Sequence, residues 1–167
     1  MGMPPRRSSS QRRDRLIREK RHDAYRATGH LPEPTSCPEC RASYRDGRWT
    51  WERASVDAHK TLCPACRRIK DDYPGGWVNL SGSFLGAKRD EIVQCIRHTE
   101  ERQCRDHPMK RIIAVWDDAD GLVVTTTDPH LARAIGSAVR SAYAGELEYQ
   151  YAKGEDELRV SWKRDVE

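Results

Sequence analysis

The sequence predicts an α+β fold with a basic N-terminal arm, a small four-cysteine module and an α-ββ-α-ββ module whose sheet is mostly antiparallel. Two Cys-x2-Cys pairs lie between residues 37 and 66, which predicts the small module. After residue 90, helical patterns alternate with pairs of strand patterns. Nine of the first 26 residues are arginine or lysine. These observations divide the 167-residue chain into 1–34, 35–89 and 90–167.

The composition leaves little material for a hydrophobic core. Apolar residues make up 37% of the chain, charged residues 34% and aromatic residues 7%. We therefore expect a core that is small or divided, with another source of stability beside it. No apolar run approaches the roughly 18 residues that cross a bilayer, and the N-terminus shows no apolar signal segment. The expectation is a cytoplasmic protein with no membrane partner.

The net charge of +4 is unevenly distributed along the chain. Residues 1–26 carry nine basic and three acidic side chains, a net +6, while 27–89 carry +3 and 90–167 carry −5. Arginine suits bidentate contacts with phosphate and outnumbers lysine eight to one in the arm. The pattern favours a polyanion partner for the basic end and a protein partner for the acidic module. A charged tail that only keeps the protein soluble remains an alternative.

Within the arm, residues 1–11 lack periodicity and are expected to be disordered, residues 11–27 suit a helix, and residues 29–34 form a linker. That helix has too few apolar residues to bury a face alone, so we expect it to order on a partner. Candidate RNA contacts are the arm arginines and the basic residues after the second cysteine pair. They are Arg6, Arg7, Arg12, Arg13, Arg15, Arg18, Arg67, Arg68 and Lys70.

The strongest chemical signal is the motif CPEC-x22-CPAC. A Cys-x2-Cys turn lets two thiolates reach one ion, and two such turns supply the tetrahedral set of a structural zinc. The predicted ligands are Cys37, Cys40, Cys63 and Cys66, in a zinc ribbon-like module. Four protein ligands leave no position for a catalytic water. Disulfides, a redox pair and an iron–sulfur cluster are the weaker alternatives.

Two further cysteines and one histidine are interpreted as structural or surface residues. Cys95 and Cys104 lie nine positions apart on a predicted helix. They therefore face opposite ways, roughly 13 Å apart, and cannot share a metal. We expect ordinary half-buried thiols there. His59 lies between the cysteine pairs and is expected at the surface, although it also offers a substitute ligand.

Aromatic and basic residues alternate around the cysteine pairs. The aromatic residues are Tyr44, Trp49, Trp51, Tyr73 and Trp77, and the basic ones are Arg41, Arg45, Arg48, Arg53, Arg67, Arg68 and Lys70. Rings and guanidinium groups together suit unpaired bases and phosphates. The same rings also suit a small core over the metal, which a ribbon of this size needs. Both interpretations remain open.

The last module begins with a helix and a hairpin. The residues 77–89 are interpreted as a glycine- and serine-punctuated connection, and a helix is predicted from about Asp90 to before Pro108. Its predicted inner face includes Ile92, Ile96, Thr99 and Gln103. Strands over 111–116 and 122–127 are joined by DDADG, a hairpin turn.

A second helix and hairpin follow. Asp128 and Pro129 are typical of a helix start, and Gly145 of a helix end. The predicted inner face of this helix consists of Leu131, Ile135, Ala138 and Ala142. Residues 146–151 and 157–162 alternate apolar and polar side chains around KGED, as half-buried strands do. The prediction is a four-stranded sheet with helices on one face.

The sequence gives little support for catalysis. It contains no GxxxxGK, HExxH or GxSxG motif. The acids Asp117, Asp118 and Asp120 would suit a cation, but between two strands they favour a solvated turn. We predict a protein that is not an enzyme, with an RNA-processing enzyme that uses these acids as a weaker alternative.

Four segments together resemble a known family: the CPxC pairs, RRIKDDYPGGW, HPMKRI, and TTTDPHLARAIGSAVRSAYAGELEYQY. They resemble the small bacterial relatives of the zinc-binding ribosomal large-subunit export adaptor, over roughly residues 35–165. In the archaeal and eukaryotic adaptors, Cys-x2-Cys pairs bind zinc and the protein docks on the large subunit. This chain has fewer such pairs and lacks the long C-terminal portion, so nuclear export is not implied. The resemblance implies ribosome or ribosomal RNA binding, with the same four cysteines as metal ligands.

The leading hypothesis is a zinc-stabilised protein that binds the ribosome, in subunit maturation or in holding idle ribosomes under stress. The arm would supply phosphate contacts and the ribbon would dock by shape and stacking. The alternative is a zinc-ribbon protein-interaction or transcription-regulatory module whose arm binds DNA.

Overall fold

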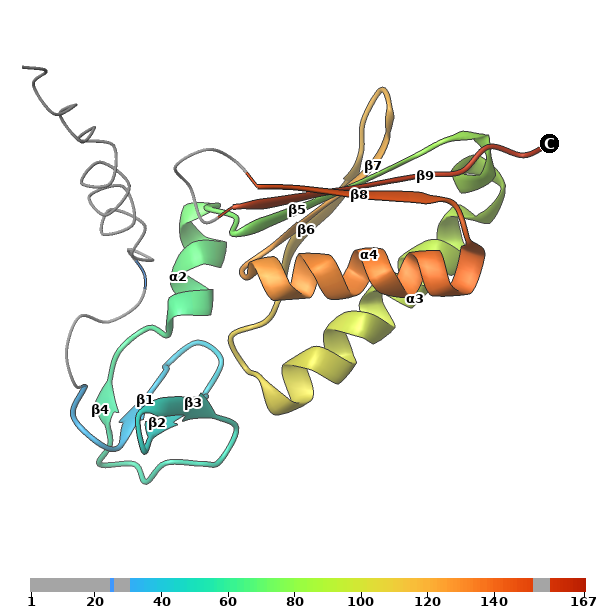
Figure 1. Cartoon of the computed structure of the whole chain (residues 1–167). Coiled ribbons are helices and arrows are strands. Elements are labelled where there is room, and N and C mark those ends of the chain that lie inside the picture. Colours follow the sequence, from blue (N-terminus) through green and yellow to red (C-terminus); the bar gives the residue numbers. More distant parts are fainter. Residues whose placement is uncertain (1–24, 26–30, 152–156) are drawn as a thin grey trace, which may run out of the picture.

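The computed structural model describes residue 25, residues 31–151 and residues 157–167. The helix predicted over 11–27 lies outside this part of the chain except for Tyr25, as do the turn at 153–156 and most of the arm. The described residues form an α+β structure with three helices and two sheets (Figure 1). The predicted fold class is confirmed at this level.

The first module is a small sheet followed by a short helix. Its strands are β1 (Thr35–Ser36), β2 (Ser43–Arg45), β3 (Arg48–Thr50) and β4 (His59–Lys60). They are arranged β3-β2-β1-β4, with β1 and β4 parallel. Asp46 and Gly47 have positive φ angles of 51° and 76°, which a two-residue turn between β2 and β3 requires. Helix α2 (Pro64–Asp71) leaves this sheet and leads into the second module.

The second module is a five-stranded sheet in the order β6-β7-β5-β9-β8. Its strands are β5 (Gly76–Ser81), β6 (Ile112–Asp117), β7 (Gly121–Thr126), β8 (Glu146–Tyr151) and β9 (Leu158–Lys163). Strand β5 is central, antiparallel to β7 and parallel to β9. Helices α3 (Ser83–Asp106) and α4 (Pro129–Tyr143) lie on one face of the sheet (Figure 1).

The central strand corrects the predicted four-stranded sheet. Residues 77–89 were expected to be a connection, but they contain most of β5 and the start of α3. The boundary predicted after residue 89 therefore falls inside a helix. Glycine and serine near β5 favour a linker, whereas its strand partners lie 40 or more residues away and leave no local signal. A kink at Lys88, where φ is −123°, explains why the regular helical pattern begins near Asp90.

The core lies between the sheet and the two helices. Its largest members are Trp162, Leu80, Ile92, Ile96, Leu122, Leu131, Ile135, Leu158, Val78, Val124, Val139 and Val160. On α4 the buried face includes Val139 and Gly136, while Ala138 is half-buried and Ala142 is exposed. The predicted face of α4 was thus rotated from the observed one. No helix in the described part of the chain is long and apolar enough to cross a membrane.

Candidate metal centre

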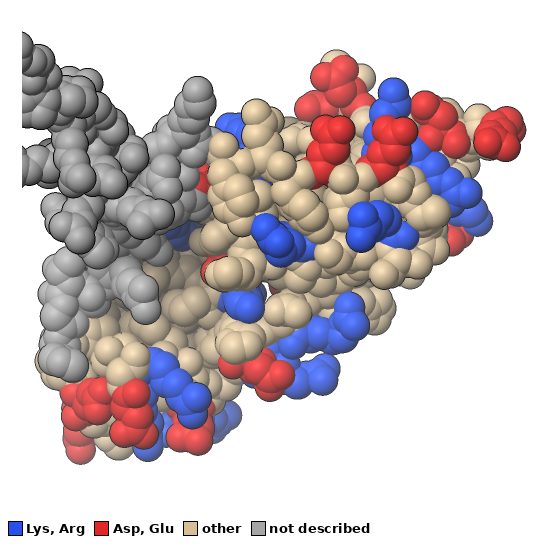
Figure 2. Space-filling model, in the orientation of Figure 1, with Lys and Arg blue, Asp and Glu red and all other residues tan. Residues whose placement is uncertain are grey.

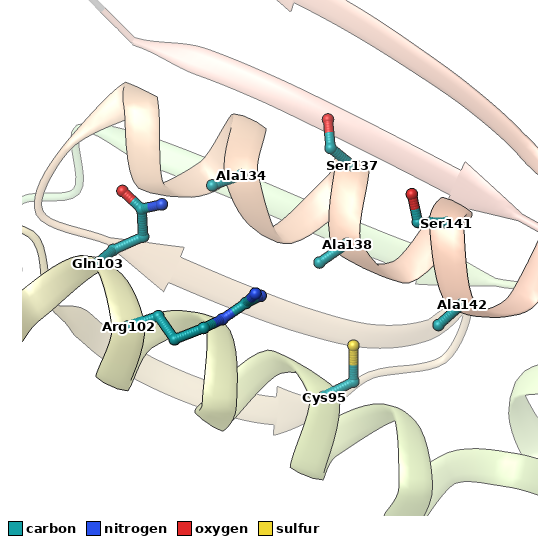
Figure 3. A pocket seen from close by; sticks show the side chains of 8 residues that line it. All are labelled: Cys95, Arg102, Gln103, Ala134, Ser137, Ala138, Ser141 and Ala142. Carbon is teal, nitrogen blue, oxygen red and sulfur yellow. The ribbon is translucent and has the colours of Figure 1, made fainter.

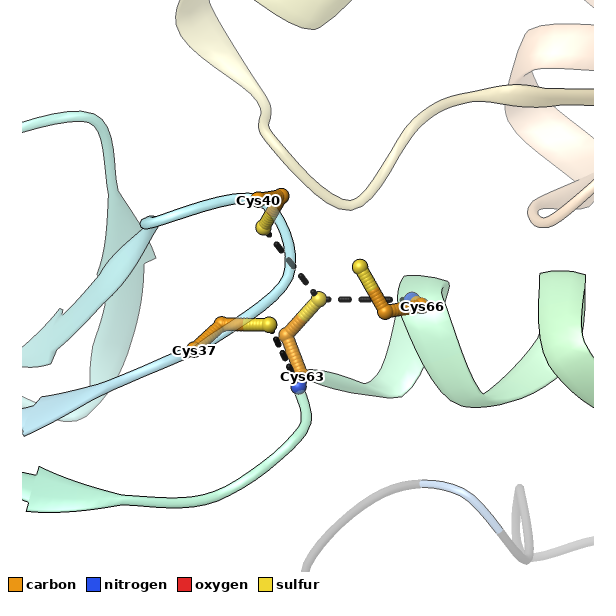
Figure 4. A group of neighbouring side chains, drawn as sticks. All are labelled: Cys37, Cys40, Cys63 and Cys66. Carbon is orange, nitrogen blue, oxygen red and sulfur yellow. Dashed lines mark hydrogen bonds between the residues drawn. The ribbon is translucent and has the colours of Figure 1, made fainter.

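The two cysteine pairs meet where β1 ends and α2 begins. Cys37 follows β1 directly, and Cys40 lies in the turn after it. Cys63 is the N-cap of α2, and Cys66 lies in its first turn. All four sulfur atoms lie within 4.8 Å of one another (Figure 4). The structure therefore brings the predicted ligand set together in a geometry suited to binding a metal ion.

Backbone amides hold the sulfur atoms in place. The Cys63 amide donates to the sulfur of Cys37 and the Cys66 amide donates to that of Cys63, each at 3.3 Å. The sulfur atoms of Cys40 and Cys63 are 3.7 Å apart. Because the positive end of α2 points at this group, the helix favours thiolates over thiols.

The same sulfur atoms form the centre of the small core of the first module. Cys37 and Cys63 are fully buried, and Trp49, Leu62 and Met109 pack around them. Trp49 also contacts Tyr44 on the neighbouring strand, with ring centroids 5.6 Å apart. Two of the five aromatic residues around the motif thus serve this core, whereas Trp51 and Tyr73 are 40% and 55% exposed.

An arginine from the second module closes one side of the cysteine group. Arg111, just before β6, donates from Nη2 to the sulfur of Cys40 at 2.9 Å and from Nη1 to that of Cys66 at 3.2 Å. Its Nε donates to the carbonyl of Pro108 at 2.8 Å, which fixes the direction of the guanidinium. Its charge therefore lies against sulfur atoms that are 45 and 71 residues away in sequence. Sequence reasoning did not assign Arg111 to the site.

Further contacts place the cysteine group at the junction of the two modules. Trp51, from the first module, donates from its indole nitrogen to the carbonyl of Cys104 in α3 at 2.7 Å. The guanidinium of Arg111 lies 5.5 Å from the centre of the same indole ring. A metal bound here would therefore stabilise the docking of the modules as well as the ribbon itself.

The hydrogen bonds also set the protonation of the thiols. The hydrogen bond with Cys63, helped by the bond and charge of Arg111, outweighs burial and lowers the pKa of Cys40 to about 4. The same pairing, together with burial, raises the pKa of Cys63. Burial disfavours the charge of Arg111, but its bonds to Cys40 more than compensate and raise the pKa of the guanidinium. Cys40 therefore carries an anionic sulfur that faces the guanidinium of Arg111.

The predicted RNA contacts divide into three sets. Arg67 and Lys70 are exposed on α2. Arg68 instead stacks on two rings, 4.6 Å from the centre of Tyr25 and 5.6 Å from that of Tyr73. The arm arginines lie outside the described residues. They are Arg6, Arg7, Arg12, Arg13, Arg15 and Arg18.

The remaining candidates lie apart from the cysteine group. Cys95 and Cys104 are half-buried, and His59 is exposed, as expected. DDADG forms the predicted hairpin turn, in which the carboxylate of Asp118 accepts backbone bonds at 2.9 Å. Asp117 accepts two bonds of 2.8 Å from Arg89. Within the described residues, the four cysteines form the one group suited to hold a metal.

The fold and the site together define an α+β protein with a four-cysteine group suited to binding a metal ion. No family model, no curated protein and no solved structure matches the chain.

Proposed function

We propose that this is a zinc-stabilised protein that binds the ribosome through ribosomal RNA, without catalysing a reaction. The observation that carries the proposal is the contact between the arm and α2. Tyr25, the one described residue among the first 30, donates a 3.1 Å hydrogen bond to Asp71 at the end of α2. Its ring also lies 5.6 Å from that of Tyr73. Tyr25, which belongs to the basic segment 1–26, thus contacts α2 near its exposed basic side chains.

The spacing of one sulfur pair supports zinc as the proposed metal. Zn–S bonds of about 2.3 Å in a tetrahedron place neighbouring sulfur atoms about 3.8 Å apart. The Cys40 and Cys63 sulfur atoms are 3.7 Å apart. A zinc with four thiolates carries a net −2, and the nearby guanidinium of Arg111 offsets part of that charge.

The metal would orient the basic surface. Because Cys63 and Cys66 belong to the first turn of α2, an ion bound to them fixes the helix relative to the ribbon. Arg67 and Lys70 follow within the next turn and are exposed. Phosphate contacts need such positioned cations, and rings nearby can stack on unpaired bases. Tyr73, 55% exposed at the end of α2, supplies one such ring.

The choice of the ribosome rests on the resemblance to the ribosomal export adaptor family. A protein that recognises folded RNA and performs no chemistry would suit either the maturation of a subunit or the holding of idle ribosomes. The arm supplies sequence-independent affinity, whereas the rigid α2 and ribbon supply a fixed shape.

Co-sedimentation with purified ribosomal subunits over a range of salt concentrations tests the proposal. We expect binding at low salt that weakens steeply as salt rises, because each neutralised phosphate releases counterions. The double variant Arg67→Ala/Lys70→Ala should weaken binding. It should also reduce the salt slope, which is the steepness of log affinity plotted against log salt concentration, by about 2. The matched control, Arg97→Ala/Arg105→Ala, removes the same charge from exposed positions of α3 and should bind normally.

Three results would contradict the proposal. Absence of co-sedimentation at low salt would exclude ribosome binding. Equal losses in the α2 and control variants would show that net charge alone governs the association. Tighter binding to duplex DNA than to ribosomal RNA would favour the DNA-binding alternative instead.

A further inference from the structure

Two tyrosines stand exposed on the edge strand β8. Tyr149 is 39% exposed and Tyr151 is 60% exposed. They alternate with Glu148 and Gln150, so both rings project from the face of the sheet on which α4 lies. Apolar or aromatic rings at an edge are normally covered or replaced by charges. Their exposure here requires a reason.

Helix α4 fixes both rings. Arg133 donates from Nη2 to the hydroxyl of Tyr151 at 2.8 Å, and its guanidinium lies 4.8 Å from the centre of the Tyr149 ring. The hydroxyls of Tyr149 and Ser137 are hydrogen-bonded at 3.1 Å. One arginine therefore holds two exposed rings in set positions, which reduces the conformational entropy that a ligand must restrict.

Basic side chains of α4 surround the rings, although residues 90–167 carry a net −5. Helix α4 contains Arg133, Arg140 and His130 and no acidic residue, and all three are exposed. Glu146 and Glu148 project from the opposite face of the sheet, because side chains alternate along β8. In Figure 2, acidic side chains gather above the basic ones on α4 and to their right.

A groove with one charged lining residue runs between α4 and α3, and Ser137 borders it as well. The groove has a volume of about 760 Å³ and is lined mainly by small side chains of α4 facing α3. Arg102 extends from α3 into it (Figure 3). Arginine side chains therefore lie on both flanks of α4.

We propose that Tyr149 and Tyr151 form a stacking site for unpaired bases of single-stranded RNA, with Arg140 in contact with the phosphates. Residues two apart on a strand are about 7 Å apart, so each ring offers a separate place for one base. Rings beside arginines are the arrangement with which proteins hold single strands. The choice of RNA over other single strands rests on the proposed function. A protein segment pairing with the β8 edge is the competing occupant.

Fluorescence anisotropy with the full-length protein and a labelled uridine dodecamer tests this site. Tyr151→Ala and Tyr149→Ala should each weaken binding about 5- to 100-fold, the range for loss of one stacked base. Tyr151→Phe keeps the ring and should stay within about 3-fold of the unchanged protein, because the ring face carries the stacking. Trp116→Ala, which removes a ring 40% exposed near the acidic hairpin, is the matched control and should bind normally. Arg140→Ala should lower the salt slope by about 1.

Unchanged affinity in both alanine variants would overturn the site, as would an equal loss in Trp116→Ala. Another outcome is that the alanine variants still bind the dodecamer but no longer bind a protein that the unchanged chain takes from ribosomal preparations. In that case the β8 edge binds protein instead, and the stacking site is refuted. Circular dichroism of each variant excludes unfolding as the cause of a loss.

The α2 variants separate the two proposals. If ribosome binding depends on α2 while substitution of the tyrosines has no effect, this inference alone is refuted. Tyrosine-dependent dodecamer binding without ribosome binding refutes the proposed target alone.

Discussion

Replacing Arg111 by leucine tests whether the second module contributes to the metal centre. The substitution removes the two short bonds to Cys40 and Cys66, at 2.9 and 3.2 Å, and the charge that faces the thiolates. The main-chain amide of residue 111 keeps its 2.9 Å bond to Thr127, so the start of β6 should remain in place. The loss is therefore confined to the guanidinium.

The expected magnitude follows from the role of the guanidinium as an outer partner of the ligands. Loss of such a partner typically lowers metal affinity by 10- to 100-fold, or about 1.4 to 2.8 kcal/mol. We expect the upper part of this range, because Arg111 contacts three ligands at once and lies half-buried, where its charge is less screened. Arg111→Lys keeps the charge but not the two-pronged donor geometry of the guanidinium. Its loss of zinc affinity should therefore lie near the lower limit of this range.

Competition with a chromophoric zinc chelator near neutral pH measures the affinity. Arg97→Leu, which removes an exposed arginine of α3, is the matched control and should bind zinc normally. The rate of zinc release after addition of a thiol-alkylating reagent gives a second measurement, which should rise in Arg111→Leu alone. Affinity and release rate both within about twofold of the unchanged protein would refute a role for the second module at the metal site.

Three further predictions concern metal content, stability and pH. Elemental analysis should find near one zinc per chain, and Cys37→Ser should lose it and unfold the first module while the helices of the second persist; absence of metal in the unchanged protein would refute the assignment. Asp128→Ala removes the N-cap of α4 and should cost about 1 kcal/mol in urea unfolding, whereas Asp128→Asn should cost less. The pKa of Asp117 is lowered by the guanidinium bonded to it. Its stabilising effect should therefore be present at neutral pH and disappear as pH falls below the usual carboxyl range, and Asp117→Asn should remove this pH dependence.

Elements whose partners are close in sequence could be predicted, because their signals are local. The β6–β7 hairpin encloses its own turn, and α4 begins at the capping residue Asp128. The four cysteines were predictable for a chemical reason: the spacing within each pair already suits a shared ion. Their approach within 4.8 Å then requires only that the two turns meet.

Features that depend on distant partners could not be predicted. Strand β5 pairs with β9 about 80 residues later, and nothing in its own residues indicates a central position. Arg111 reaches sulfur atoms on another module, and an arginine before a strand has no feature that indicates such a contact. The contacts of Tyr25 likewise could not be predicted, because its partners Asp71 and Tyr73 lie 46 and 48 residues further on.

The distribution of charge in space leads to one more prediction, on the salt dependence of the two proposed RNA surfaces. The sequence assigns −5 to residues 90–167, but the acids of this region lie on α3, on the hairpin turn, on the outer face of β8 and near the C-terminus, whereas α4 carries none. At physiological salt, charges more than about 8 Å apart are largely screened, so the local face determines what binds. Binding through the arm and α2 depends on ion pairs with phosphate and should weaken steeply with salt, while base stacking on Tyr149 and Tyr151 should respond much less. The salt slope for ribosomal subunits should therefore exceed that for the uridine dodecamer, measured with the same protein. Equal slopes would mean that one charged surface serves both ligands.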